Sequence, residues 1–205
     1  MALETMALET EVKLSIHGAT ALRRALRAAG FRPGRRRQES NWLFDDANGR
    51  LRRQALLLRL RRSGRAWTLT AKGRPQGDRR LKIRREAEVA LADGDAARAL
   101  LAVLGFRPRL AYERERTLWR SPAWPGLAAA WDRTIAGDFL ELEGPARQIR
   151  GAARKLGFAP ADFIIASYPD LFRAWARRAG HRGATFSLPA QRGNALPASR
   201  PSQPR

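Results

Sequence analysis

The feature that most constrains this chain is a pattern of paired carboxylates, helix and helix stop that occurs three times. Each copy begins with Glu-x-Glu in a segment of strand character and ends, after a helical segment, in Gly-Phe-x-Pro. The copies run from Glu9 to Pro33, from Glu86 to Pro108 and from Glu141 to Pro160. Gly-Phe-x-Pro alone is a common way to end a helix. Its recurrence downstream of Glu-x-Glu predicts a repetitive strand–helix–strand architecture.

The paired carboxylates point to a metal site built from strands. Residues two apart in a strand face the same way, so each Glu-x-Glu aims two carboxylates in one direction. Carboxylates packed together repel unless a cation lies between them, and hard divalent metals prefer oxygen ligands. These acids occur in a chain whose formal net charge is +21.

The positive surplus predicts attraction to phosphates, whether in nucleotides, polyphosphate, nucleic acid or anionic lipid. Nearly all the basic residues are arginine, which can also reflect genome composition. The lysines are more informative, because only Lys13, Lys72, Lys82 and Lys155 occur. Lysine is a compact point charge and arginine a fixed fork, so retained lysines indicate sites that need lysine chemistry.

Composition also excludes several classes of protein. There is no cysteine, hence no disulfide and no thiolate metal site. We see no signal peptide and no apolar run of about 18 residues, so we expect no membrane helix and a cytoplasmic location. The length of 205 residues suits one domain with a real core.

The coarse secondary structure favours an α+β fold, an eight-stranded antiparallel β-barrel with helices packed on the outside. The Arg35-Arg36-Arg37 run is expected in a solvated loop. Residues 1–7 read as an N-terminal extension, 8–180 as the domain, and 181–205, rich in Gly, Pro, Ser, Gln and Arg, as a disordered tail. We expect helices over about 20–29, 95–104, 145–156 and 169–178, and strands over about 8–16, 39–45, 55–62, 66–71, 80–91, 109–119, 127–134 and 139–143.

In these strands the aliphatic residues alternate with charged ones. Arg59 and Arg61 alternate with Leu58 and Leu60, for example. For a single strand the more common arrangement exposes the charges to solvent. Alternatively, the charges line the barrel interior and the aliphatic residues lie outside, under amphipathic helices. A charge-lined tunnel would bind an elongated polyanion together with its metals.

Nine short motifs then follow one another in order: Glu9-Thr10-Glu11-Val12-Lys13, Asn41-Trp42-Leu43-Phe44-Asp45, Leu58-Arg59-Leu60-Arg61, Thr68-Leu69-Thr70-Ala71-Lys72-Gly73, Arg84-Arg85-Glu86-Ala87-Glu88, Arg114-Glu115-Arg116, Trp131-Asp132, Phe139-Leu140-Glu141-Leu142-Glu143 and Ser167-Tyr168-Pro169-Asp170-Leu171. As an ordered set over about residues 8–175, they resemble the CYTH superfamily, the triphosphate tunnel metalloenzymes. That superfamily includes class IV adenylate cyclases, thiamine triphosphatases and inorganic triphosphatases.

The resemblance implies a tunnel with defined roles for its lining. It also implies Lys72 and Glu88 as catalytic residues, with Glu86 in the same lining. One departure is Ala166, where many members carry a basic residue. The implied ligands of Mg²⁺ or Mn²⁺ are Glu9, Glu11, Asp132, Glu141 and Glu143, and the implied phosphate-binding residues are Lys13, Arg59, Arg61, Lys72, Arg84, Arg114 and Arg116.

The leading interpretation is a metal-dependent triphosphatase whose substrate is a small triphosphate, with inorganic tripolyphosphate first because no separate base-recognition motif is visible. Thiamine triphosphate, a nucleoside triphosphate and an adenylate cyclase forming cyclic AMP remain alternatives. A non-enzymatic module that binds nucleic acid or polyphosphate is the alternative from another class. We expect no membrane partner, and nucleic acid only through a non-specific basic surface.

Overall fold

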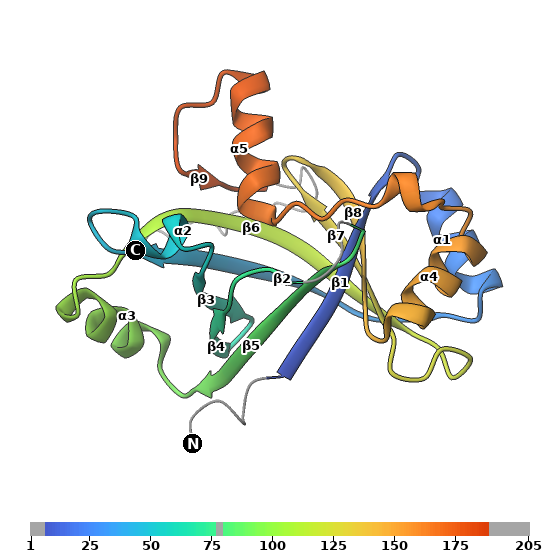
Figure 1. Ribbon diagram of the computed structural model, residues 1–205, viewed down its shortest axis with the longest axis horizontal. Helices are drawn as coiled ribbons and strands as arrows, with labels where there is room; N and C mark the ends of the chain where they lie inside the picture. The colour runs from blue at the N-terminus through green and yellow to red at the C-terminus, as the bar shows by residue number, and fades with distance from the viewer. Residues whose placement is uncertain (1–6, 77–79, 189–205) are drawn as a thin grey trace, which may run out of the picture.

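The computed structural model describes residues 7–76 and 80–188, and its strands form one closed ring (Figure 1). Neighbouring strands follow the order β2-β3-β4-β5-β1-β8-β7-β6, and a pairing between β2 and β6 closes the ring. All of these pairings are antiparallel. The predicted eight-stranded barrel is therefore confirmed. Its strands are β1 Ala7–Ile16, β2 Arg32–Asp45, β3 Leu57–Ser63, β4 Ala66–Lys72, β5 Lys82–Leu91, β6 Arg107–Arg120, β7 Ala128–Thr134 and β8 Gly137–Glu143.

The longest strands are β2 and β6, which pair along nearly their whole length. Because of this partner, β2 begins at Arg32 and includes the arginine run that the sequence placed in a loop. Arg36 pairs with Thr117, and Arg37 with Arg116. The prediction of a loop was wrong for the backbone, although the side chains of the run are exposed as expected.

The three Gly-Phe-x-Pro segments each end a helix in the same way. The helices are α1 Ala19–Ala28, α3 Gly94–Val103 and α4 Ala146–Lys155. Gly30, Gly105 and Gly157 all have left-handed backbone angles, with φ of 84°, 84° and 89°. The amide of the following phenylalanine then donates to a carbonyl five residues back, as in Phe31 to Leu26 at 2.9 Å. This is the hydrogen bond of a Schellman stop, so the repeated helix stop is confirmed. The predicted strand–helix–strand order holds for the first two copies, whereas α4 of the third is followed by a 3-10 turn and not by a strand.

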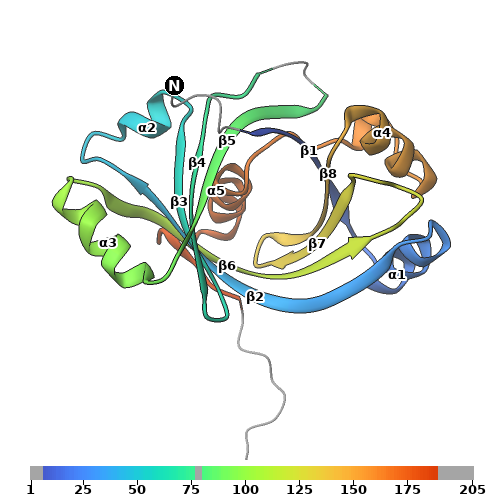
Figure 2. The same ribbon diagram turned by 90° about the horizontal axis from the view of Figure 1, so that it is seen from below.

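The aliphatic faces of the strands lie outside the ring, under these helices. Leu14 of β1 and Leu140 of β8 pack in one cluster with Leu26 of α1 and Ile149 of α4. On the other side, Leu60 of β3 packs with Leu101 of α3. Figure 2 shows α3 and the α1–α4 pair on opposite sides of the ring. Since neighbouring residues of a strand face opposite ways, the charged residues must point into the barrel.

The last helix, α5 Tyr168–Ala179, follows a 3-10 turn, η1 Pro160–Asp162, and lies at one end of the barrel. Before it, Ile164 exchanges two backbone hydrogen bonds with Lys13 of β1, at 3.0 and 2.8 Å. Its Tyr168 and Phe172 pack on Tyr112 of β6, a strand residue of the charged, inward face. The helix therefore brings aromatic side chains to the mouth of the interior.

The C-terminal segment is ordered further than the sequence predicted. Disorder was expected from His181, yet Thr185–Phe186 forms a short strand, β9, parallel to β6. Phe186 is 2% exposed and stacks on Phe172 with ring centroids 5.1 Å apart. The prediction of disorder is wrong for residues 181–188, because the buried Phe186 ring anchors this polar segment. The rest of the predicted tail, residues 189–205, and residues 1–6 of the predicted N-terminal extension lie outside the described residues.

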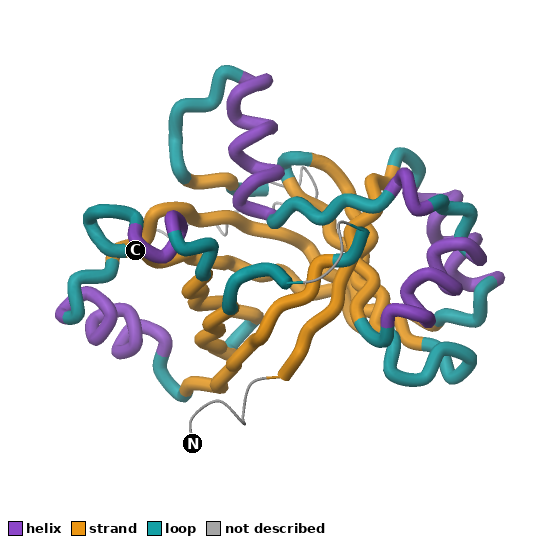
Figure 3. Tube along the Cα trace, in the orientation of Figure 1, coloured by secondary structure: helices purple, strands orange, loops and turns teal. Residues whose placement is uncertain are grey.

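Figure 3 shows the resulting division, with strands forming the ring and helices confined to its periphery and end. Among the residues that the structure describes, no helix has both the length and the hydrophobicity to cross a membrane.

Candidate active site

The interior of the barrel brings together the residues for which the resemblance implied a role in metal binding, phosphate binding or catalysis. They are joined by others that the sequence analysis did not assign, namely Glu39, Lys82 and Tyr168. The lining consists of eight acids (Glu9, Glu11, Glu39, Glu86, Glu88, Asp132, Glu141 and Glu143) and eight bases (Lys13, Arg59, Arg61, Lys72, Lys82, Arg84, Arg114 and Arg116).

Lys13 is almost completely buried within this lining. Its Nζ is 2.9 Å from Glu11 Oε1 and 2.9 Å from Glu141 Oε2. Burial alone would lower the pKa of Lys13, but the two carboxylates outweigh it and raise that pKa. Burial likewise opposes ionisation of Glu11, yet Lys13 holds its pKa at about 2. Lys13 is therefore a fixed cation inside the barrel.

A second buried network is centred on Asp132 of β7. Arg116 donates from Nε and Nη2 to the two Asp132 oxygens, each at 2.6 Å, and also reaches Glu141 at 2.8 Å. Arg114 bonds both Asp132, at 3.2 Å, and Glu39, at 2.8 Å. The hydroxyl of Tyr168 donates to Asp132 as well. Protein donors thus occupy the oxygens of Asp132, which orients both arginines.

Lys72 on β4 connects the acids nearer the opening of the interior. Its Nζ is 2.6 Å from Glu9 Oε2 and 3.0 Å from Glu86 Oε2. Burial raises the pKa of Glu9 to about 7, against the opposing effect of Lys72. A cation bound beside this carboxyl would lower its pKa again, because an opposite charge favours the ionised form.

The strands β3, β4 and β5 contribute a third group. Arg61 Nη2 lies 3.3 Å from Glu88 Oε1, and Arg59 Nη2 lies 3.3 Å from Thr70 Oγ1. Thr70 in turn donates to Glu88 at 2.9 Å. The Glu88 side chain is 42% exposed, so this group faces the open part of the interior.

Arg84 is placed differently from the other arginines. Its Nε donates to the Gly73 carbonyl at 2.6 Å and its Nη2 to the Ala55 carbonyl at 2.8 Å. The guanidinium therefore holds two loops together as well as lending its charge. Its neighbour on the same face, Lys82, lies 3.2 Å from Glu11. Lys82 could have been found from the sequence, because it shares strand parity with Arg84 and is one of only four lysines.

The acids fit a divalent cation in type, and several of them lie on neighbouring strands. Glu11 and Glu143 are register partners on β1 and β8, and Glu9 precedes Glu11 on the same face. Burial and the nearby carboxylates raise the pKa of Glu143, so like charges are crowded here. In residues 7–76 and 80–188, no three acids lie together as a ready-made metal cluster. Glu9 and Glu11 are instead bonded to lysines.

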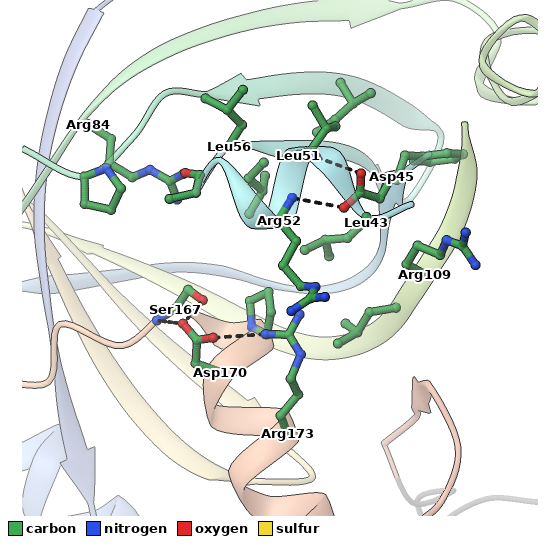
Figure 4. Close-up of a pocket in the computed structure, with 18 of the residues that line it drawn as sticks. Leu43, Asp45, Leu51, Arg52, Leu56, Arg84, Arg109, Ser167, Asp170 and Arg173 are labelled. Atoms are coloured by element: carbon green, nitrogen blue, oxygen red, sulfur yellow. Dashed lines mark hydrogen bonds and ion pairs between the residues drawn. The ribbon is translucent and has the colours of Figure 1, made fainter. Parts of the chain in front are cut away.

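A pocket of about 700 Å³ opens at the end of the barrel near α5 (Figure 4). One wall is the short helix α2 Arg50–Arg53, which the sequence did not predict. Asp45 of β2 accepts hydrogen bonds from the Leu51 and Arg52 amides of this helix, at 2.8 and 3.0 Å. The pocket is lined by aliphatic residues, among them Leu43, Leu56, Leu58, Leu110 and Ile165, and by charged residues, among them Lys82, Arg52, Arg84, Arg109 and Arg173.

This architecture is shared with known proteins. A candidate adenylate cyclase from Vibrio parahaemolyticus has a TM-score of 0.70 and 19% identity over 81% of this chain and 98% of its own. The PH1819 protein from Pyrococcus horikoshii has a TM-score of 0.67 and 24% identity over 81% and 98%. A Hippeastrum protein is described as a candidate adenylyl cyclase with dominant triphosphatase activity. It has a TM-score of 0.62 and 20% identity over 81% of this chain and 95% of its own.

These likenesses show the fold, and no curated protein matches the chain. The CYTH domain model, however, matches residues 7–165, which reach from the first strand to the segment before α5. The match therefore includes all eight strands whose inner faces carry the acids and bases described above. The chain belongs to the CYTH domain family.

Proposed function

We propose that this protein is a metal-dependent triphosphatase that hydrolyses a triphosphate inside the barrel, with inorganic tripolyphosphate as the first candidate substrate. One observation carries the proposal: the barrel interior holds lysine and arginine side chains buried among carboxylates. Burying charges is costly, so a fold that needed only stability would place aliphatic residues there. Phosphoryl transfer needs this combination, because cations must neutralise the phosphate oxygens.

The bases of the interior would bind the phosphates. Arginine forks suit bidentate contacts with phosphate oxygens, and lysine supplies a point charge. Arg84 would contribute mainly its charge, because carbonyl groups already accept its hydrogen bonds. The phosphate-binding set is Lys13, Arg59, Arg61, Lys72, Arg84, Arg114 and Arg116.

The acids would hold Mg²⁺ or Mn²⁺. Glu9, Glu11, Glu141 and Glu143 lie on two paired strands, and Asp132 keeps Arg114 and Arg116 oriented beside them. A divalent cation bound here supplies neutralisation of phosphate charge and a more acidic bound water. Lys13 and Lys72 are now bonded to these carboxylates. Once the carboxylates bind the metal, both lysines would bind phosphate oxygens instead.

Lys72 and Glu88 would act at the reacting phosphate. Glu88 is the most accessible of the paired acids and already accepts a hydrogen bond from Thr70, which fixes its orientation. It would accept a proton from the attacking water. Lys72 would stabilise the charge that develops on the phosphate oxygens.

A second candidate function is an adenylate cyclase, in which a ribose hydroxyl replaces water as the nucleophile. The pocket near α5 favours this possibility, because its leucines lie among arginines and tripolyphosphate has no organic group to contact the leucines. The same pocket would serve a thiamine or nucleoside triphosphatase.

The test is to incubate the protein separately with tripolyphosphate, thiamine triphosphate and ATP, each with Mg²⁺, Mn²⁺ or EDTA, and to identify the products. We expect phosphate release from tripolyphosphate that stops in EDTA and returns with metal. Cyclic AMP from ATP would favour the cyclase. Full turnover in EDTA would contradict the role of the carboxylates, and no turnover of any triphosphate would contradict the proposed function.

A further inference from the structure

Asn41 is a buried amide with no hydrogen-bond partner. It lies on β2, is 1% exposed, and neither its Nδ2 nor its Oδ1 contacts a partner in the described structure. Leaving a buried donor or acceptor unsatisfied costs about 1–3 kcal/mol per group. A residue that adds such a cost at the centre of a long strand requires an explanation.

The side chain of Asn41 faces the interior. The next residue, Trp42, points the other way, where it stacks on Trp67 at 5.6 Å and packs in the cluster beneath α3. Glu39, two residues before and on the Asn41 face, bonds the inward-pointing Arg114 at 2.8 Å. Asn41 therefore projects from the same wall as the residues of the candidate active site.

A second unsatisfied donor lies on the adjoining strand. Asn41 is the register partner of Arg61 on β3, and Arg59, two residues earlier on the same face, has a buried Nε without a partner. The Arg59 Nη2 is already bonded to Thr70. This stretch of wall thus offers two donors, Arg59 Nε and Asn41 Nδ2, and one acceptor, Asn41 Oδ1.

The acceptor, Asn41 Oδ1, shows what kind of ligand would supply hydrogen-bond partners to all three atoms. Phosphate oxygens accept hydrogen bonds but, when ionised, do not donate, so they can satisfy Arg59 Nε and Asn41 Nδ2 only. Asn41 Oδ1 needs a partner with a proton to donate, such as water or a hydroxyl group. A phosphate group with a water beside it would satisfy all three atoms at once.

We propose that Asn41 holds the nucleophile against the reacting phosphate, donating from Nδ2 to a phosphate oxygen and accepting at Oδ1 from the attacking water. The inference rests on the proposed triphosphatase function. In the step, the water oxygen bonds to phosphorus while the bond from phosphorus to the leaving diphosphate oxygen breaks. The proton released by the water passes to Glu88, which pairs with Arg61, the register neighbour of Asn41.

The experiment replaces the amide by an aliphatic side chain of similar size, Asn41→Leu. The unsatisfied amide disappears, so the melting temperature should hold or rise. The kcat/KM for tripolyphosphate should fall by roughly tenfold or more, because an oriented donor and acceptor are lost. A residue with a purely structural role would not give a stable protein with impaired turnover.

Gln148→Leu is the matched control. Gln148 lies on α4 and also has a buried amide oxygen without a partner, but it lies outside the barrel. The change is the same in chemistry, and kcat/KM should stay at the wild-type level. Undiminished turnover in a folded Asn41→Leu protein would overturn the inference, as would an equal loss in Gln148→Leu.

Two further measurements keep this inference separate from the proposed function. If Asn41→Leu does not fold, Asn41→Asp retains the acceptor and loses the donor, and we expect weaker tripolyphosphate binding with a raised KM. If the wild type hydrolyses no triphosphate, the proposed function fails. Calorimetric binding of tripolyphosphate then decides on Asn41: weaker binding in Asn41→Leu than in Gln148→Leu supports it, and equal binding overturns it.

Discussion

At the scale of single residues, most buried charges of the interior are matched with opposite ones. Arg114 on β6 is among the largest fully buried side chains. It bonds Glu39 and Asp132, which lie on the two neighbouring strands, β2 and β7. The parity of the strands predicted most of these residues. Glu39 was missed, because it was the first residue of the expected strand. At the end of a strand, the alternation of neighbouring residues does not show which way the side chain points.

Glu39 gives a prediction on stability and pH. Burial would raise its pKa, but Arg114 and then Arg116 hold the pKa at about 2, below the ordinary value of 4.5. A carboxyl with a lowered folded-state pKa stabilises the fold above the unfolded pKa and loses that contribution as the pH falls toward the folded value. Glu39→Gln should therefore lower the free energy of unfolding at pH 7 by on the order of 3 kcal/mol.

The measurement is urea denaturation of both proteins from pH 7 to pH 2. The difference between them should shrink between pH 4.5 and about 2, the window set by the two pKa values. The exposed Asp95→Asn on α3 is the control and should change stability by less than about 0.5 kcal/mol. A difference that stays constant with pH would contradict the assigned pKa.

At the scale of elements, the sequence was informative where periodicity and helix stops agree, and less so where tertiary contacts decide. The repeated Gly-Phe-x-Pro stops located α1, α3 and α4 because the glycine conformation they need is local. The early start of β2 depends on its long pairing with β6. The short strand β9 depends on the hydrophobic cluster between α5 and β6 in which Phe186 packs. Neither has a signal within its own residues.

The ordering of the C-terminal segment is testable through Phe186. This ring is buried against Phe172 and lies near Trp175 in the cluster that joins α5 to β6. Phe186→Ala should lower the free energy of unfolding by about 3–5 kcal/mol, the usual cost of removing a buried phenylalanine. Val103→Ala, 88% exposed on α3, is the control. Chemical denaturation compares the two, and equal stabilities would show that β9 contributes nothing to the fold.

At the scale of the whole molecule, the net charge and the candidate active site are separate features. The eight acids and eight bases of the interior cancel, so the surplus of +21 belongs to the rest of the chain. The basic exterior attracts polyanions of any kind, with the salt dependence that such contacts have. A binding module would use that exterior, whereas an enzyme of the kind proposed here must use the interior.

Two adjacent arginines on β3 separate these possibilities most directly. Arg61 points into the barrel and pairs with Glu88 at 3.3 Å, whereas Arg62 is exposed on the opposite face, where it bonds the Gly64 carbonyl. Arg61→Gln and Arg62→Gln remove the same charge from the same strand. The measurement is kcat/KM for tripolyphosphate hydrolysis with Mg²⁺ or Mn²⁺, in both variants and the wild type. We expect a loss of roughly 100-fold in Arg61→Gln and wild-type turnover in Arg62→Gln. Equal effects in the two variants would rule out an active site inside the barrel.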